Sequence, residues 1–359
     1  ELYFTPRRHR CLALSDESVA IARRSGDTRA LVDALSVRRL LAGGPAALAE
    51  RLTMSDEVVV VAERAGDVTS ALRGRVARVV DLVEAGRVDT IDAEIDAVAR
   101  LADEIRQPAW SWYPAKWRAM RAIMAGRVDE GERLAGEALA IGRRPHGRTA
   151  AQAHIVQLAE IRRCQGRLGE LEAHMAGGAR QYRAVAAWRC GLAWLHAEVG
   201  RDADARHGLD ELAADGFAAL PDDFTRVTCM AMLAEVAVTV DDAERAAALF
   251  ELLSPYANQC MFAGQAELYG GWVTRYLGLL ATTLRRWPEA ERFLLDARRS
   301  SDQMGARPDV ARTEAGLAAL YSARAASGDR ERSEAAAQRC IAEAEYLRLP
   351  ALARDVLTR

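Results

Sequence analysis

The chain has 359 residues, of which half are hydrophobic, and a formal net charge of −2. The apolar share is sufficient for a buried core, and the balanced charge argues against a general nucleic-acid binder or a polybasic membrane-surface protein. No apolar run approaches the roughly 18 residues that a membrane helix needs, and residues 1–10 do not form a signal-peptide pattern.

The six cysteines are widely scattered and form no C-x-x-C pair. The sequence therefore gives no support for a zinc site or a redox motif. Most of them lie among apolar residues, which favours a reducing, cytoplasmic compartment. Lys116 is the only lysine, and the other basic residues are all arginine. This preference for arginine over lysine fits a GC-rich genome. Arginine-specific recognition of a partner is the alternative explanation.

Apolar residues recur at positions i, i+3, i+4 and i+7 along almost the whole chain, between short segments of Gly, Pro or Asp. This pattern predicts helices, and strand signals are nearly absent. The one β-branched run, Val58–Val61, lies within Ser55–Gly66, which we interpret as a helix with Ser55 as its N-cap. The Asp pairs at 222–223 and 241–242 are interpreted as helix caps rather than catalytic carboxylates.

A repeated unit organises the chain. Ser-Asp-Glu triplets begin at residues 15 and 55, and turn glycines lie at positions 86, 126, 166 and 200. Each unit reads as helix A, turn, helix B; one unit has its helices at about 110–124 and 128–141. Stacking such pairs buries their apolar faces in one continuous core.

The sequence therefore predicts an all-α fold, an α-solenoid of about eight or nine antiparallel helix pairs in a right-handed superhelix. It is expected to form a single helical-repeat domain over 1–359. Within it, 1–44 is a partial first repeat, 45–349 holds degenerate repeats of about 40 residues, and 350–359 is a terminal helix.

Small or apolar residues at fixed offsets after the turn, such as Val128, Gly131, Ala135 and Ala138, resemble helix B of tetratricopeptide repeats. The period usually exceeds the ~34 residues of the standard repeat, and the aromatic helix-A signature is mostly absent. The resemblance is therefore to a degenerate, lengthened form of that repeat.

A narrower resemblance covers nearly the whole chain. The phrases ALSDESVAIARRSGD, LADEIRQPAWSWYPAKWRAMRAIMAGR and RYLGLLATTLRRWPEAERFLLDA are similar to the repeat region of large actinobacterial regulators. Those proteins resemble MalT-like signal-transduction ATPases, with a nucleotide-binding module before the repeats and often a LuxR-type helix-turn-helix after them. The sequence contains no P-loop motif. The missing initiator Met and a first unit that begins with helix B favour a segment of a longer protein.

The aromatic segment Gln107–Trp117 departs from the repeat. One helical face of this region is expected to pack in the core, and it carries Trp110, Tyr113, Trp117 and Met120. Three other side chains lie off that face, and we interpret them as candidates to line a concave binding groove: Trp112, Lys116 and Arg118.

The segment Tyr256–Tyr276 also interrupts the pattern, with three glycines at 264, 270 and 271. It is either a long loop that leads into an A helix or a binding loop at the groove. On the second interpretation Trp272, Arg275 and Tyr276 face a ligand or partner.

No catalytic or metal-binding constellation stands out, because the six histidines share no ligand spacing and no nucleophile motif is present. We therefore expect no enzyme activity, no cofactor, no direct nucleic-acid contact and no membrane contact. The resemblance implies a domain of a cytoplasmic signalling or transcription regulator whose groove binds a protein segment or a small effector. A free-standing scaffold is the alternative, and a helical-repeat enzyme of the prenyltransferase α-subunit type is the remote one. Self-association through the end helices also stays open.

Overall fold

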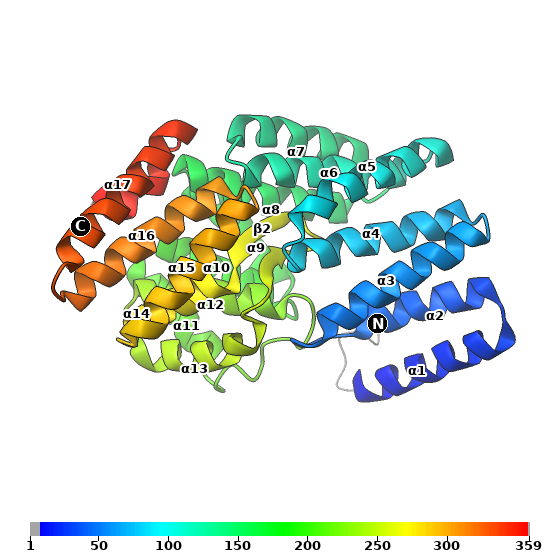
Figure 1. The fold of residues 1–359 in the computed structure, drawn as a ribbon, viewed down its shortest axis with the longest axis horizontal. Coiled ribbons are helices and arrows are strands. Elements are labelled where there is room, and N and C mark those ends of the chain that lie inside the picture. The colour runs from blue at the N-terminus through cyan, green and yellow to red at the C-terminus, as the bar shows by residue number, and fades with distance from the viewer. Residues whose placement is uncertain (1–7, 358–359) are drawn as a thin grey trace.

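The computed structural model describes residues 8–357, and these are almost entirely helical (Figure 1). The helices of the first half are α1 (Arg8–Ser25), α2 (Thr28–Leu41), α3 (Ala47–Arg64), α4 (Val68–Glu84), α5 (Val88–Ile105), α6 (Pro108–Met124), α7 (Val128–Gly142), α8 (Arg148–Gln165), η2 (Leu168–Leu171) and α9 (Glu172–Gln181). The all-α prediction is confirmed.

The second half continues in the same way until a β-hairpin interrupts it. Its elements are α10 (Ala186–Glu198), α11 (Asp202–Ala213), α12 (Arg226–Thr239), α13 (Ala243–Leu253), η3 (Ser254–Tyr256), β1 (Cys260–Ala263), β2 (Leu268–Trp272), α14 (Val273–Thr283), α15 (Trp287–Gln303), α16 (Arg307–Arg324), α17 (Asp329–Leu347), η4 (Pro350–Ala353) and α18 (Arg354–Leu357). The terminal helix expected over 350–359 is thus two short segments, and 358–359 lie outside the described residues.

The predicted turns separate helices that pack against each other. Gly86 lies between α4 and α5, Gly126 between α6 and α7, and Gly200 between α10 and α11. The unit expected at about 110–124 and 128–141 is the pair α6 and α7, with Pro108 at the start of α6, where a missing N–H costs least. Asp242 caps α13 by accepting a hydrogen bond from the Arg245 backbone N–H (3.0 Å), as interpreted from the sequence.

The expected N-cap at Ser55 is wrong. The β-branched run does lie in a helix, but α3 begins eight residues earlier, at Ala47. Ser55 is buried inside α3, and its hydroxyl donates to the Asp81 carboxylate (3.0 Å), which also accepts two hydrogen bonds from Arg39. A buried carboxylate needs such donors, and this requirement explains a buried serine at this position.

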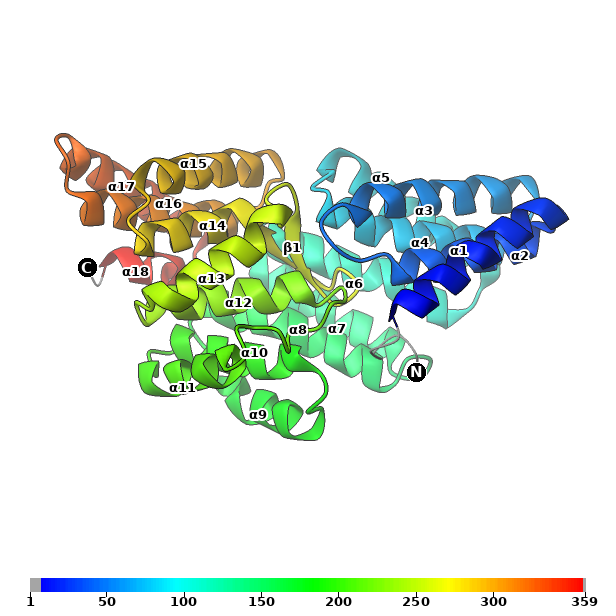
Figure 2. The ribbon, with the colours of Figure 1, turned by 90° about the horizontal axis from the view of Figure 1, so that it is seen from below.

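Helices from the end of the chain pack against helices from its middle. Helix α16 contacts α6, and η4 contacts α8. Figure 2 shows the hairpin between the α1–α5 side of the molecule and the α14–α16 side. Strand β1 contacts α4 and α12, while β2 contacts α6 and α15. The hairpin therefore joins parts of the repeat that are distant in sequence.

Three turn glycines spaced 40 residues apart touch side chains from the second half of the chain. A Cβ atom added to Gly86 would lie 2.4 Å from the Trp272 ring, and one added to Gly126 would lie 2.6 Å from Leu347. At Gly166 the same atom would lie 2.5 Å from the Arg354 guanidinium. All three glycines have positive φ, so both the turn and the contact favour glycine.

Gly126→Ala is expected to lower the free energy of unfolding by about 1–2 kcal/mol, because φ is +79° and the methyl group would press on Leu347. The matched control is Gly136→Ala, at an exposed position inside α7 where a Cβ meets nothing within 4 Å. That change is expected to stabilise by about 0.5–1 kcal/mol. Urea unfolding measures the free energy of unfolding of both variants. Equal changes in the two variants would contradict the assignment of the turn at Gly126.

Candidate functional site

The segment Tyr256–Tyr276 folds as an antiparallel hairpin, which the sequence did not predict. Residues Cys260 and Trp272 pair at its base, and a bulge interrupts the register after Met261. Gly271, in the bulge, has φ +101°, and a Cβ there would lie 2.4 Å from the Asp309 carboxylate. The glycine therefore allows the strand to lie close to α16.

The tip of the hairpin is held by α6 and α8. Lys116 Nζ forms an ion pair with Glu267 and donates to the Gln265 carbonyl (3.2 Å), which also accepts from Trp117 Nε1 (2.9 Å). Gln157 Nε2 donates to the carbonyls of Lys116 (2.7 Å) and Glu267 (3.1 Å). The two segments that depart from the repeat thus meet at one buried contact.

Lys116, the only lysine, is 1% exposed. Its ammonium group lies 4.4 Å from the centroid of the Trp112 ring and 5.2 Å from that of Tyr113. Burial lowers the pKa of Lys116, while the nearby Glu267 carboxylate acts in the opposite direction. The buried ion pair positions the hairpin tip more than it stabilises the fold, because both charged groups lose their hydration.

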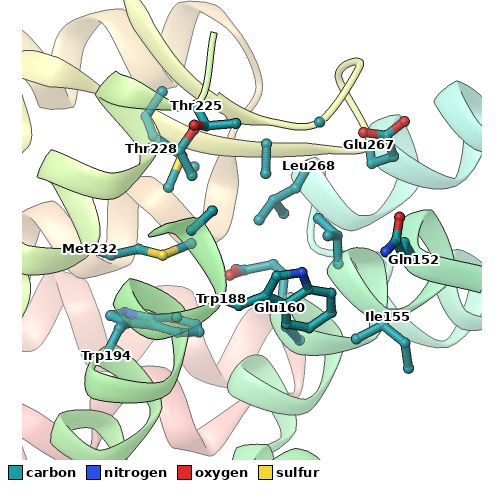
Figure 3. Close-up of a pocket in the computed structure, with 18 of the residues that line it drawn as sticks. Gln152, Ile155, Glu160, Trp188, Trp194, Thr225, Thr228, Met232, Glu267 and Leu268 are labelled. Carbon is teal, nitrogen blue, oxygen red and sulfur yellow. The ribbon is translucent and has the colours of Figure 1, made fainter. Parts of the chain in front are cut away.

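A cavity of about 360 Å³ lies between the hairpin and the helices α8, α9, α10 and α12. Figure 3 shows Trp188, Trp194 and Ile155 on one side and Leu268 of the hairpin on the other. The apolar lining includes Ile155, Val156, Met175, Trp188, Trp194, Met232, Met261 and Leu268. The exposed side chains Val185 and Phe224 stand among the lining residues, so the cavity opens to solvent there.

Trp188 owes its position to a glycine on the preceding helix. A Cβ on Gly178 of α9 would lie 2.4 Å from the Trp188 ring. The ring also stacks on Tyr182, with the two centroids 6.1 Å apart. Because the ring is fixed on this side, its remaining surface is available to line the cavity.

Buried charges form the inner end of the cavity, and Glu235 of α12 is their centre. Its carboxylate is 2.9 Å from Arg163 and 2.7 Å from Arg275, and it accepts a hydrogen bond from Trp194 Nε1 (2.6 Å). Burial alone would raise the pKa of Glu235, but Arg163 and Arg275 outweigh it and hold that pKa well below its usual range. Arg163 also pairs with Glu198.

The charges continue into α16. Arg275 Nε lies 2.9 Å from the Asp309 carboxylate and forms an ion pair with it. The geometry of this contact is not that of a hydrogen bond. Asp309 accepts a hydrogen bond from the Ser301 hydroxyl (2.5 Å). Burial raises the pKa of Asp309, and Arg275 opposes that effect only in part.

Glu160 of α8 also lines the cavity and is 6% exposed. Its Oε1 atom is 2.6 Å from Arg312 and accepts a hydrogen bond from the Cys164 thiol (3.4 Å). Burial raises the pKa of Cys164 to about 12, so this thiol stays protonated at neutral pH. No donor among the described residues bonds to the second oxygen of Glu160, Oε2.

A second cavity, of about 300 Å³, lies against the opposite side of the hairpin tip. It is bordered by α2, α3, α4 and α6, and its lining shares Phe224, Gly264 and Gln265 with the first cavity. Glu84 lines it and pairs with Arg51, and burial raises the pKa of Glu84. The hairpin tip is therefore a wall common to both cavities.

The structure places the three groove residues predicted on α6 in different settings. Trp112 is buried against Ala138 and Ala150, and Lys116 is buried under the hairpin tip. Arg118 is exposed, pairs with Asp96 (3.0 Å) and lines neither cavity. A binding role for these side chains stays a prediction, although Lys116 supports the cavity indirectly by holding the hairpin.

The three residues predicted around β2 lie closer to the cavity. Tyr276 lines it, and its hydroxyl donates to the Gly270 carbonyl (2.5 Å). Arg275 lies behind the lining and holds Glu235. Trp272 packs with Met304 in a separate apolar cluster and lines neither cavity.

Sequence reasoning did not single out Trp188, Trp194 or Glu235. One signal for Glu235 was present, since it is the lone carboxylate in the apolar helix RVTCMAMLAEVAVT. A single charged residue inside such a helix needs a buried partner. The two tryptophans lie six residues apart in one helix, a spacing that by itself favours no particular site.

The site and the fold together define an all-α helical-repeat protein with an inserted hairpin that covers an apolar cavity. No protein-family model matches this sequence, and no curated protein matches it. None of the described helices has a stretch long and apolar enough to cross a membrane. Within residues 8–357, no group of three or more His, Cys, Asp or Glu side chains is arranged to hold a metal ion.

Proposed function

We propose that this chain is a non-catalytic binding domain that takes a small, largely apolar effector in the cavity beneath the hairpin. The observation that carries the proposal is the cavity itself, which lies where the hairpin breaks the repeat and is lined mainly by Trp, Met and aliphatic side chains. Its volume of about 360 Å³ lies within the range of small-molecule sites. Its polar lining includes Glu160, Arg163 and Glu235 at the inner end, and groups elsewhere such as Gln152, Thr228 and Glu267, all of which can orient a ligand.

The resemblance of the repeat to MalT-like regulators supports a place in a cytoplasmic signalling or transcription-regulating protein. The hairpin suits such a role because it is bonded to α6, α8, α12 and α14 at once. A ligand beneath it contacts the hairpin and α10 together and thereby changes how these elements pack. A free-standing scaffold is the alternative, and a full gene without a nucleotide-binding or DNA-binding module would favour it.

Gly191→Leu is expected to abolish binding of an apolar probe without destabilising the fold. Gly191 lines the cavity from α10, and a Cβ there meets only Met232, at 4.0 Å. The new side chain therefore extends into the cavity, while replacing a helical glycine favours the helix. The probe is the neutral dye N-phenyl-1-naphthylamine, whose fluorescence rises in apolar sites. At least about a tenfold loss of affinity is expected for a probe that fills the same space.

The control for this change is Gly136→Leu, which adds the same side chain at an open position of α7 that lines neither cavity. It is expected to leave dye binding unchanged. Equal dye binding by Gly191→Leu and the wild-type protein, with both folded by circular dichroism, would reject this cavity as the binding site.

A further inference from the structure

The balance of buried charge at the inner end of the cavity constrains the ligand. The cluster consists of four carboxyl groups and three guanidinium groups: Glu160, Glu198, Glu235 and Asp309 with Arg163, Arg275 and Arg312. Its formal charge is −1 if all are ionised and zero if Asp309 holds a proton. Neither state leaves a positive charge for an anionic ligand. The adjacent pair Lys116–Glu267 is balanced by itself.

The guanidinium that lines the cavity is already engaged. Arg163 contacts Glu198 through two nitrogens and Glu235 through one of them, and it lies 5.1 Å over the Trp194 ring. An anion at this point would compete with two carboxylates. The charges therefore disfavour a carboxylate or sulfate group on the ligand.

The Glu160 carboxylate can accept a further hydrogen bond. It is buried, lines the cavity and, among the residues that the structure describes, forms an ion pair only with Arg312, through Oε1. Its second oxygen has no donor among the described residues and is not one of the buried polar atoms left without a partner, so it stays accessible to a ligand in the cavity. Glu160 and Trp188 both line this cavity, as Figure 3 shows. A cavity that holds both a carboxylate and an aromatic face is a favourable setting for an organic cation.

We propose that the effector is an amphiphilic organic ammonium ion, with its cationic group at Glu160 and Trp188 and its apolar part along the Met and aliphatic lining. This inference rests on the proposed function and specifies the ligand class of the same cavity. The ammonium group donates to the free oxygen of Glu160 and lies against the indole face, while the apolar part displaces water from Met175, Met232 and Leu268.

The test uses three probes with one chain length: octylammonium, octan-1-ol and octanoate, each below its aggregation concentration. Displacement of N-phenyl-1-naphthylamine from the full chain gives their affinities at pH 7. We expect octylammonium to bind about tenfold more tightly than octan-1-ol, since a hydrogen bond to a charged group gives that order of gain. Octanoate is expected to bind more weakly than both.

Two variants assign the preference to named side chains. Glu160→Gln is expected to remove most of the tenfold preference for octylammonium while octan-1-ol affinity stays within about twofold. Trp188→Leu keeps an apolar wall and leaves the ion pair between Glu160 and Arg312 intact. It is expected to weaken the binding of octylammonium more than that of octan-1-ol. Glu132→Gln is the control, since Glu132 pairs with Arg162 and lines neither cavity.

The outcomes separate this inference from the proposed function. If octan-1-ol binds but octanoate equals octylammonium, the ammonium class is wrong and the cavity remains a binding site. If folded Glu160→Gln and Trp188→Leu both keep the full preference, the placement of the ammonium group at Glu160 and Trp188 is wrong. If none of the three probes displaces the dye, both proposals fail. A preference that both variants reduce and Glu132→Gln leaves intact supports the inference.

Discussion

Glu235→Leu is expected to lower the free energy of unfolding by about 3–5 kcal/mol. The substitution leaves Arg163 and Arg275 without the carboxylate that lies between them, and it removes the acceptor of Trp194 Nε1. Each of these groups lies at or behind the inner wall of the cavity, where water does not replace the lost partner easily. A buried charge without a partner is among the costliest defects in a folded protein.

Urea unfolding followed by far-ultraviolet circular dichroism measures this effect. The control is Glu130→Gln, which breaks an exposed pair with Arg127 in the turn between α6 and α7 and is expected to cost less than about 1 kcal/mol. A Glu235→Leu variant as stable as this control would show that Arg163 and Arg275 do not depend on Glu235.

Lys116→Met is expected to destabilise the protein by about 3–5 kcal/mol and to weaken dye binding. The change leaves Glu267 buried without its ammonium partner and frees the Gln265 carbonyl from one of its two donors. The hairpin tip then loses its main attachment to α6. Because Gln265 and Leu268 border the cavity, its shape changes with the position of the tip.

The double variant Lys116→Met with Glu267→Gln provides the matched test, measured by urea unfolding and dye titration. It removes both charges together, so about half or more of the lost stability is expected to return. Double and single variants of equal stability would contradict the assignment of the cost to an unpaired Glu267.

The repeat was predictable because its signals are local. Turn glycines at a step of 40 residues and helical periodicity between them predicted the helices and the pairing of α6 with α7. The same glycines also have a long-range role that no local pattern contains. Gly126 meets Leu347 and Gly86 meets Trp272, contacts that depend on how the chain folds back.

The hairpin was not predictable by the same means. Its strands are only four and five residues long, and the second holds two glycines, which weaken a strand signal. Long-range contacts specify it instead, with Lys116, Gln157 and Thr228 each bonded to its backbone. The sequence marked both segments, 107–117 and 256–276, as departures from the repeat, but only the fold shows that they touch.

The charged end of the cavity was hidden for a similar reason. Glu160, Glu235 and Arg275 lie on three different helices, and their ionic partners are 34 or more residues away in the sequence. In an arginine-rich chain the charges alone do not indicate which pairs are buried. Burial of the lone carboxylate in α12 was the one inference that apolar periodicity would have allowed.

The most direct test of the binding site is a methyl nuclear magnetic resonance spectrum of the protein with labelled methionines, titrated with octan-1-ol. Three of the eight methionines line the cavity, Met175, Met232 and Met261, and the others, such as Met54 and Met120, do not. If the cavity is the binding site, the three cavity methyl signals are expected to shift together as the alcohol binds, while those of Met54 and Met120 stay in place. Shifts at Met54 or Met120 without shifts at the cavity methionines would contradict this assignment of the site.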